Sequence, residues 1–516
     1  MTEILPAGIG GLTFALDDVG TSFIALFAFV WILSGVYAWF TVPADDRARL
    51  FVYYLPAAVG GIAVAAAADA VSFYLCFALM AIPVWGLIAH PRTHASRRAA
   101  AIYLTLTAVS EALLLAALVL MATEADGLAL TALRSAVGGT PTAGYVTTLL
   151  LLSLGLKIGT LPASGILPVM YAHGPSGAAA ALAGASTKVG ALALVRLLPA
   201  GVMSEGWTSA VMVIGCATAF GAAVLGVLTT TPRAVLGYSS ASQMGLVLVA
   251  AAASLSTPEA IGLAHGAVVA FSLHHGLAKG ALMLGDDVVA RLSGRARTVA
   301  LAALAVPAIS LVGVPLSSGF VAKYALKDAM HALHGPVPET VYALIPFTAI
   351  GTAALMIRFY LLVRRRPQQP ATPARIPAVL WAVMLAASVI TVWIWPAQWN
   401  THAIESAFDV GSMWSAIWPA LAAIAGAYIL RFAPGRVRRL AGSVPPGDVL
   451  HTATRWIRGL DALVSASRRS AREPSTDRRR RMRDLLMSTE RQLVAWTTAT
   501  TLFVALAILL ILLSTR

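Results

Sequence analysis

Residues 258–284 read PEAIGLAHGAVVAFSLHHGLAKGALML. This stretch is long enough to cross a bilayer as a helix, because about 20 apolar residues span the hydrocarbon core. Its one lysine, Lys279, lies well inside the run instead of at an end. An ionisable side chain within a spanning helix marks a functional site by default. The stretch therefore predicts a membrane helix that carries an internal functional group.

The rest of the chain also has the composition of a membrane protein. Of its 516 residues, 58% are hydrophobic and 12% are charged, and the mean hydropathy is +0.79. Soluble chains are about 45–50% apolar and about 25% charged, so a soluble or disordered chain is excluded. We expect an all-α polytopic membrane protein. Its spanning helices, about fourteen in number, are expected near residues 20–42, 51–69, 71–90, 99–122, 144–164, 177–200, 207–229, 234–255, 258–284, 298–333, 339–364, 377–396, 412–431 and 491–513.

Two of these spans contain helix-breaking residues close to a lysine. The span 298–333 is too long for one plain helix, and the span 144–164 runs into a proline-rich stretch. The breaking residues are Gly313, Pro315 and Gly319 in the first case and Pro162 and Pro168 in the second. Irregular backbone at membrane depth is tolerated only where protein or a water-filled cavity buries it. We therefore expect two broken helices that mark an ion path.

Arginine sets the orientation. The net charge of +14 comes mostly from arginines in short loops between apolar runs, which is typical of cytoplasmic loops and argues against nucleic-acid binding. In the predicted topology these loops share one side: Arg47 and Arg49, Arg92 to Arg98, Arg233, Arg291 to Arg297, and Arg364 to Arg366. We expect both termini on the other side and no cleavable leader. The two cysteines lie in apolar runs without a CxxC motif, so neither a disulfide framework nor a metal site is expected.

The sequence divides into three parts. Residues 1–431 form the predicted helical bundle, and residues 491–516 contain a last transmembrane helix. Between them, residues 432–490 are rich in arginine, with apolar residues at helical spacing from 449 to 464. This segment predicts an amphipathic helix on the cytoplasmic side, facing anionic lipid or an acidic neighbour. A solvated linker is an equally good interpretation of residues 468–482.

The lysines are few, and all of them fall inside predicted membrane helices. Of 37 basic residues only five are lysine: Lys157, Lys188, Lys279, Lys323 and Lys327. Arginine stays protonated, whereas a buried lysine can lose its proton. This distribution predicts proton handling. Snorkelling from a helix end is the alternative, and it suits Lys327 best.

Few polar partners accompany these lysines. Glu111 lies in the middle of a predicted span, where it is either protonated or paired with Lys157. His265, His275 and Lys279 share one face of a predicted helix and can pass protons through water. The acids at the helix ends are given little functional weight. They are Asp69, Asp286 and Asp287.

Four segments together resemble the proton-conducting core of antiporter-like membrane subunits. They begin with the stretch from Gly155 to Gly190 around Lys157 and Lys188. The others are the stretch YSSASQMG at 238–245, the stretch HGLAKGALML at 275–284, and the broken-helix pattern from Gly313 to Lys323. This family comprises the large membrane-arm subunits of respiratory complex I, Mrp-type sodium/proton antiporter subunits and membrane subunits of energy-converting hydrogenases. The similarity covers roughly residues 60–335.

The resemblance implies two half-channels related by an inverted repeat and joined by a central line of charge. In that scheme Lys157 serves the first channel, Lys188 and His275 lie towards the centre, Lys279 is the central relay and Lys323 ends the second channel. One departure stands out: Ala78 occupies the position of an expected glutamate. Either Glu111 has taken over its role or the first channel no longer pumps.

The sequence thus predicts a proton- or cation-translocating subunit of a larger complex in a bacterial-type cytoplasmic (inner) membrane. We expect it to be non-catalytic and without a cofactor of its own, and to be driven by iron–sulfur or quinone-reducing partner subunits. One alternative is an ion-gradient-driven module, in a Mrp-like antiporter or an inorganic-carbon uptake system. The other is a scaffold subunit that conducts nothing.

Overall fold

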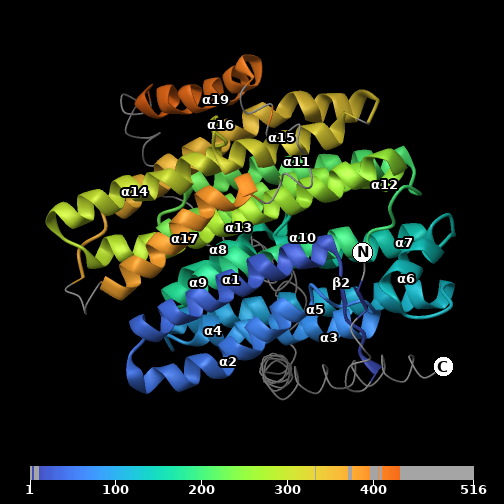
Figure 1. Ribbon diagram of the computed structural model, residues 1–516, viewed down its shortest axis with the longest axis horizontal. Coiled ribbons are helices and arrows are strands. Elements are labelled where there is room, and N and C mark those ends of the chain that lie inside the picture. Colours follow the sequence, from blue (N-terminus) through green and yellow to red (C-terminus); the bar gives the residue numbers. More distant parts are fainter. Residues whose placement is uncertain are drawn as a thin grey trace, which may run out of the picture.

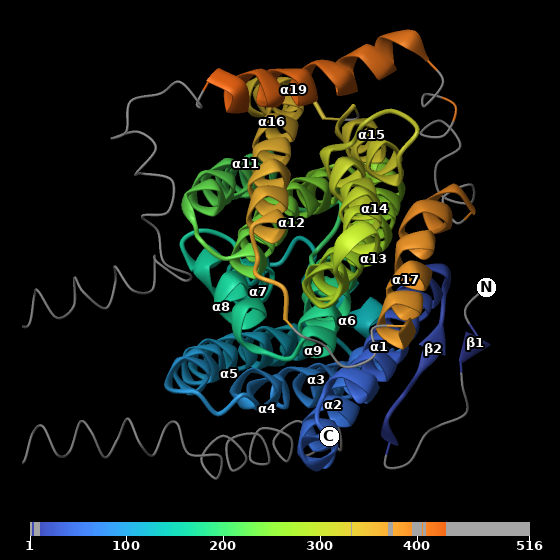
Figure 2. The ribbon, with the colours of Figure 1, turned by 90° about the vertical axis from the view of Figure 1, so that its left-hand side faces the viewer.

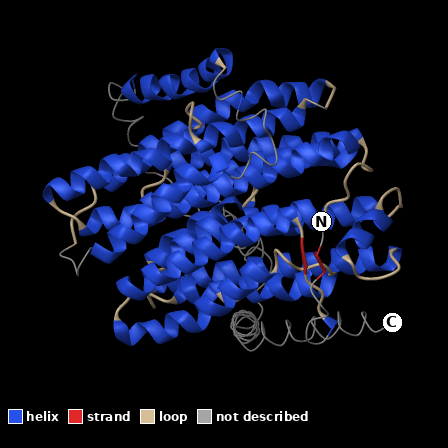
Figure 3. Cartoon of the chain, in the orientation of Figure 1, coloured by secondary structure: helices blue, strands red, loops and turns tan. Residues whose placement is uncertain are grey.

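The computed structural model shows a bundle of long helices with one small strand pair (Figures 1 and 3). It describes residues 3–4, 11–331, 333–369, 375–394, 405 and 409–429. Strands β1 (Glu3–Ile4) and β2 (Ala15–Leu16) pair in antiparallel fashion. The helices are α1 (Asp18–Thr41), α2 (Ala44–Ala63), α3 (Ala70–Ala81), α4 (Val84–Ala89), α5 (His94–Glu124), α6 (Leu130–Val137), α7 (Ala143–Ile158), α8 (Ile166–His173), α9 (Ser176–Ala181), α10 (Thr187–Leu197), α11 (Glu205–Leu228), α12 (Pro232–Ser256), α13 (Ile261–Arg291), α14 (Gly294–Val312), α15 (Ser318–Met330), α16 (Pro336–Arg364), α17 (Arg375–Ile394) and α19 (Val410–Ile429).

The prediction of an all-α polytopic membrane protein is confirmed. Among the described residues, eleven helical segments are long and apolar enough to cross a membrane. Every predicted span up to residue 431 overlaps a helix of the structure. The total of about fourteen spans and the inverted repeat stay predictions. The segment 432–490 and the helix expected at 491–513 lie outside the described residues.

Helices α12 and α13 form the centre of the bundle. An 18-residue apolar stretch of each of these helices, and one of the span Ser176–Leu197 that contains α9 and α10, is completely buried, whereas the matching stretches of α11, α14 and α16 are only about half-buried. Seen from the end of the bundle, α1 to α5 lie below this centre, and α19 lies along the opposite edge against α16 (Figure 2). A helix that is apolar on all sides belongs inside such a bundle. The polar residues of α13 are therefore placed where lipid cannot reach them.

Both predicted broken helices are present. Between α7 and α8 the chain leaves helical geometry at Gly159, which has a left-handed φ of +75°. Between α14 and α15 the same happens at Gly313, with φ +87°. The predicted breakers Pro162 and Pro315 lie in these two connections, whereas Pro168 lies inside α8 and Gly319 inside α15. The breaks are thus confirmed, and the first of them begins at a glycine that the prediction did not name.

A third irregularity was not predicted. We expected one plain helix over residues 177–200, but residues Leu182–Ser186 form a π-helical turn between α9 and α10. Such turns widen a helix locally and often occur at functional sites. This one directly precedes Lys188.

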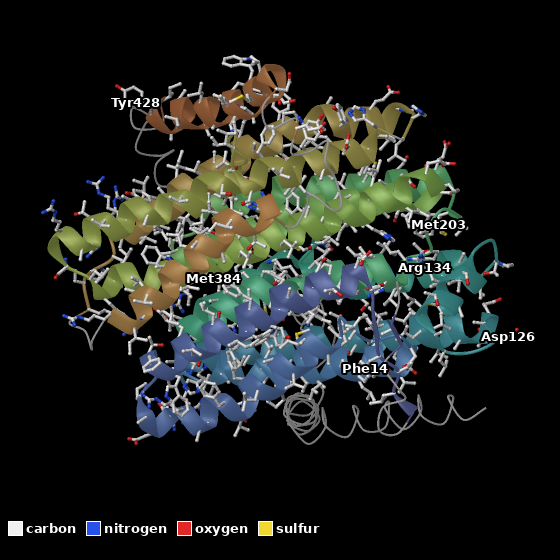
Figure 4. All side chains as sticks on the ribbon, viewed as in Figure 1. Phe14, Asp126, Arg134, Met203, Met384 and Tyr428 are labelled. Carbon is white, nitrogen blue, oxygen red and sulfur yellow. The ribbon has the colours of Figure 1, made fainter. Side chains whose placement is uncertain are left out.

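The predicted arginine-rich loops gather at one end of the bundle. Arg297 donates to the carbonyl oxygens of Arg364 and Arg366, so the α13–α14 connection touches the end of α16. Similarly, Arg49 at the start of α2 donates to the carbonyl oxygen of His90 at the end of α4. Nitrogen-rich side chains crowd this left-hand end in Figure 4, whereas Arg134 lies at the opposite end. By the positive-inside rule the left-hand end is cytoplasmic.

An ion pair joins α10 to the start of α1 at the opposite end. Arg196 pairs with Asp17, which also caps α1 by accepting from the N–H of Gly20. Burial raises the pKa of Asp17, but the hydrogen bond and charge of Arg196 outweigh burial and hold that pKa below its usual range. The carboxylate form is therefore the stabilising one.

Gly319→Ala should destabilise the α14–α15 break. A Cβ at this position would lie 1.8 Å from the carbonyl oxygen of Ser310, so the two helices must move apart, at a cost of about 1–3 kcal/mol. Thermal unfolding of the purified protein in detergent measures the effect. Gly262→Ala is the matched control, because a Cβ there meets nothing within 4 Å. Equal melting temperatures for the two variants would contradict the proposed close contact.

Asp17→Asn should lower stability at neutral pH by about 1 kcal/mol, since asparagine keeps the cap but loses the ion pair. The folded-state pKa of Asp17 is depressed, so this contribution is present above the unfolded value and is lost as pH falls through the folded value, below about 4. Thermal unfolding of both proteins across this pH range measures the difference. Asp18→Asn, at an exposed first-turn acid, is the control. A difference that persists at the lowest pH would refute this account.

Candidate functional site

The five lysines all lie in helices of the bundle, as predicted. Lys157 lies in the last turn of α7, Lys188 on α10, Lys279 on α13, and Lys323 with Lys327 on α15. Lys188 and Lys279 are completely buried, and the other three are partly buried.

Three of the lysines donate a hydrogen bond from the side-chain amine to a backbone carbonyl oxygen. Lys188 donates to Ala183 in the π turn, Lys279 donates to Leu236 of α12 at 3.0 Å, and Lys323 donates to Val312 at 2.6 Å. None of the three makes an ion pair within the described part of the chain. A carbonyl oxygen accepts a hydrogen bond from the neutral amine as well as from the ammonium. These three lysines can therefore be charged or neutral while keeping their hydrogen bonds. Because their partners are carbonyls, loss of the lysine charge leaves no partner carboxylate unpaired.

Lys157 has weaker partners. Its Nζ lies 3.9 Å from the Met80 sulfur and 5.0 Å from the centre of the Phe77 ring. Both partners belong to α3, the helix on which Ala78 replaces the expected glutamate. Thioether and aromatic contacts are worth less than a charged hydrogen bond. Lys157 is consequently held less firmly than Lys188, Lys279 and Lys323.

The Met80 sulfur also connects Lys157 to the π turn. Ser186 donates to this sulfur at 3.1 Å. A cavity of about 10 Å³ lies beside it, lined by Lys157, Ser186 and Thr187 and by Thr107 and Ser110 of α5. This volume is enough for about one water molecule with several polar neighbours. A single water there would connect Lys157 to the start of α10.

Glu111 lies near Lys157 but not in contact with it. Two reciprocal hydrogen bonds lock α5 to α7: the Ser110 hydroxyl donates to the Ser153 carbonyl at 2.9 Å, and the Ser153 hydroxyl donates to the Ser110 carbonyl at 2.7 Å. Ser153 precedes Lys157 by one helical turn, so Glu111 and Lys157 come within electrostatic reach.

Of the two alternatives for Glu111, a direct hydrogen-bonded pair with Lys157 is not seen among the described residues. Neither carboxylate oxygen of Glu111 has a hydrogen-bond partner among the described residues, although the side chain is only 5% exposed. The lysine stem turns instead towards α3 and α10, because its ammonium lies against Met80 and Phe77. The alternative, a protonated Glu111, stays open.

The π turn packs directly on α13 through two glycines. A Cβ on Gly184 would lie 3.0 Å from the Gly276 carbonyl oxygen, and a Cβ on Gly276 would lie 2.6 Å from that of Gly184. Only glycine permits this approach of two backbones. It brings Lys188 within electrostatic reach of His275 and Lys279. The predicted central group therefore comes together in the structure.

On α13 the predicted histidines differ in their surroundings. Both ring nitrogens of His275 are buried without a partner in the described part of the molecule. His265 lies ten residues, nearly three turns, towards the outer end of α13 and is partly exposed, within electrostatic reach of Arg134 and Arg196. His275 thus belongs to the central group, and His265 lies at its outer margin.

The prediction missed His274. Its Nδ1 lies 2.8 Å from the Ser318 hydroxyl, at the first residue of α15, and Ser318 in turn bonds the Ser310 hydroxyl at 2.9 Å. Lys323 and Lys279 are both within its electrostatic reach. His274 therefore bridges the centre of α13 and the second helix break. The only signal in the sequence was the pair of adjacent histidines inside an apolar run.

The acids given little weight lie at helix ends, as expected. Asp69 caps α3 by accepting from the N–H of Ser72, at 2.9 Å. Asp286 is completely buried and pairs with Arg233 and Arg366, at 3.3 and 2.6 Å. Asp287 accepts from Arg291 and from the Tyr37 hydroxyl, both at 2.6 Å. These pairs tie the cytoplasmic ends of α1, α12, α13 and α16 together.

Replacing Ser110 and Ser153 by alanine tests the link between α5 and α7. Each single variant loses the hydrogen bond that its own hydroxyl donates to the backbone carbonyl of the other serine, which costs about 1 kcal/mol, and keeps the reciprocal bond. The double variant loses both bonds and should cost somewhat less than the sum of the two single variants, because the two hydroxyls also lie 3.3 Å apart and each single variant already loses that contact. Unfolding of the three variants in detergent measures these losses. Single variants as stable as the wild type would refute the link.

Comparison with known proteins agrees with this geometry. The sequence matches the family described as "NADH:quinone oxidoreductase/Mrp antiporter, TM" over residues 67–337. NADH-quinone oxidoreductase subunit N of Cereibacter sphaeroides is 30% identical over 331 residues, which cover 62% of this chain and 70% of that protein. The subunit N of Ectopseudomonas mendocina is 28% identical over 334 residues, covering 62% of this chain and 66% of the relative.

Two solved structures share the fold. A chain of the Mrp complex from Dietzia sp. DQ12-45-1b superposes with a TM-score of 0.64 at 18% identity, covering 80% of this chain and 89% of that one. A chain of the membrane-bound sulfane sulfur reductase, an archaeal respiratory membrane complex, gives 0.63 at 18% identity, covering 80% and 85%.

Proposed function

The chain belongs to the family of membrane subunits common to NADH:quinone oxidoreductases and Mrp antiporters, and from this premise we propose that it translocates protons as one subunit of a multi-subunit membrane complex. One observation carries the proposal. A row of buried amines and imidazoles runs through the bundle from Lys157 to Lys323, and three of its lysines are held by carbonyl oxygens. Such a row can change its protonation without losing its hydrogen bonds.

The proposed relay follows the contacts between helices. A proton on Lys157 passes through the small cavity to the π turn and Lys188. From there it reaches His275 and Lys279 across the Gly184–Gly276 contact. Imidazole takes up and releases protons near neutrality, which suits it to a relay.

The last steps use the second helix break. His274 lies between the central lysines and α15, and its hydrogen bond to Ser318 fixes the ring beside the break. Lys323 then receives the proton at the carbonyl end of α14, where the helix dipole favours a cation. His265 lies apart from Lys323, at the outer end of α13 near Arg134 and Arg196, so in this scheme it would serve the central group of α13 and not the second helix break.

We assign the role of the missing carboxylate to Glu111. It is buried, lies within electrostatic reach of Lys157 and is held in place by the serine bonds between α5 and α7. Because it has no hydrogen-bond partner among the described residues, Glu111 gains most from a proton or from the approach of the Lys157 ammonium. Movement of that ammonium from Met80 towards Glu111 would be the first step of a cycle.

We propose that a redox module drives the transport, and that this subunit carries neither catalysis nor a cofactor. Support comes from the relatives named as oxidoreductase subunits and from the respiratory complex with the same fold. The similarity in fold to a chain of an Mrp complex favours a second candidate, an ion-gradient-driven antiporter module. Purifying the protein from its native membrane separates them. Iron–sulfur or quinone-reducing subunits support the first candidate, and small membrane subunits alone support the second.

Replacing Lys279 tests the relay itself. Lys279→Met should lower proton transport by about 100-fold, the lower end for a positioned proton-transfer group. Lys279→Arg should also fail, because arginine keeps a charge but does not release its proton. Transport is measured with a pH-sensitive dye in vesicles containing the assembled complex. Lys157→Met should behave in the same way.

Lys327→Gln is the matched control, because this partly buried lysine snorkels from the end of α15. It should assemble and transport like the wild type. If Lys157→Met and Lys279→Met assemble normally and transport at the control rate, the subunit is a scaffold and the proposed function is wrong.

A further inference from the structure

A basic cavity lies at the cytoplasmic end of the bundle, away from the lysine relay. It has a volume of about 340 Å³ and lies where the ends of α1, α4 and α8 meet the starts of α2, α5 and α9. The side chains that matter for the argument are Asp46, Arg49, His90, Arg92, Ser176 and Arg291. The relay does not use any of these residues.

Positive charge exceeds negative charge in this cavity. Arg49 and Arg92 share a single carboxylate, since their Nη2 atoms lie 2.9 and 3.0 Å from the same oxygen of Asp46. Arg291 is neutralised by Asp287 just outside the cavity. One arginine charge is therefore left without a counter-ion among the described residues that line the cavity.

Two buried nitrogens in the cavity wall also lack partners. The Nε of Arg49 and the Nδ1 of His90 are buried, and neither has a hydrogen-bond partner within the described chain. His90 is only 9% exposed. Ser176 accepts from Arg233 at 2.6 Å, so its own hydroxyl proton is free to be donated. Buried polar atoms are normally satisfied. The Arg49 Nε is always a donor and the His90 Nδ1 becomes one when the ring is protonated, so an acceptor-rich group in the cavity would suit both.

We propose that this cavity binds a phosphate group, supplied either by the headgroup of an anionic lipid or by free phosphate. A guanidinium presents a planar fork of donors that matches phosphate oxygens, and two guanidiniums converge here. The cavity lies at the end of the bundle that the positive-inside rule predicts to be cytoplasmic, and anionic headgroups are concentrated on that side of a membrane. Its volume suits a small ligand, since sites of this size begin at about 300 Å³.

The bound phosphate would connect three separate segments. Arg49 belongs to α2, Arg92 to the α4–α5 connection, and Ser176 to the start of α9, beside the end of the first broken helix. An anion contacted by all three holds the cytoplasmic end of the first half of the bundle together. The proposal concerns a ligand that the proposed transport function does not require, and each can fail without the other.

Binding should depend on pH through His90. Burial and then the charge of Arg49 lower the pKa of this imidazole, with Arg92 acting in the same direction and Asp46 against it. Arg291 lines the same cavity, but Asp287 neutralises its charge. A phosphate anion would offset these charges and raise the pKa of His90. Affinity should therefore increase as pH falls and His90 becomes protonated.

Native mass spectrometry of the delipidated full-length chain in a neutral detergent tests the site. Phosphatidylglycerol is titrated in, with phosphatidylcholine as the zwitterionic comparison. Arg92→Gln should weaken phosphatidylglycerol binding about tenfold, the effect of one hydrogen bond between charged groups. Because the Arg92 side chain is 61% exposed, this variant should fold normally. Arg49→Gln should have at least the same effect, and His90→Gln should remove the dependence on pH.

Arg97→Gln is the matched control, because Arg97 is an exposed arginine at the start of α5, five residues after Arg92, that does not line the cavity. It should bind as the wild type does. If inorganic phosphate in excess displaces the lipid and raises the melting temperature, the source is free phosphate; if it does neither while phosphatidylglycerol binds, the source is the lipid headgroup. Equal binding by the wild type, Arg92→Gln and Arg97→Gln, or equal binding of both lipids, overturns the proposal.

Discussion

The structure depends on one constraint: an amine placed inside a membrane must have a hydrogen-bond partner that serves it with and without its proton. A carboxylate partner would fix the ammonium and trap the proton. The protein uses backbone carbonyl oxygens instead, at Ala183, Leu236 and Val312. A regular helix uses its carbonyls internally. Two of these three acceptors accordingly belong to irregular backbone, the π turn and the end of α14.

The breaks, the π turn and the glycine contact therefore form one arrangement. Gly159 ends α7 two residues after Lys157, the π turn ends just before Lys188, and Gly313 ends α14 beside Lys323. Lys279 is the exception, since it lies in an unbroken helix and reaches the carbonyl of a neighbouring one. The cytoplasmic ends are held differently, by arginine–carboxylate pairs around Asp286 and Asp287. Ion pairs connect the ends of the helices, whereas the lysines inside the bundle make hydrogen bonds that they can keep with or without their proton.

The sequence was sufficient to predict the helices, the two breaks and the placement of the lysines inside helices. The length of each apolar run, and a glycine or proline within it, can be read directly from the residues. It was insufficient wherever the answer depended on how two helices rotate. The choice between a protonated Glu111 and one paired with Lys157 stayed open for this reason. The Lys157 amine lies near Met80, which no pattern in the sequence indicates. The π turn has no compositional signature either. His274 was overlooked because its partner, Ser318, lies 44 residues away on another element.

The confinement of lysine to the bundle also decides which reagents and enzymes can mark this protein. Acetylation, ubiquitin attachment and amine-directed cross-linking all need an accessible primary amine. All five lysine side chains belong to α7, α10, α13 and α15, and the arginine-rich loops offer guanidinium groups instead. The water-exposed loops therefore carry no lysine for such chemistry. Except at Lys327, which lies in the last turn of α15, any lysine adduct that forms on the intact protein reports on the interior and on an amine that has given up its proton.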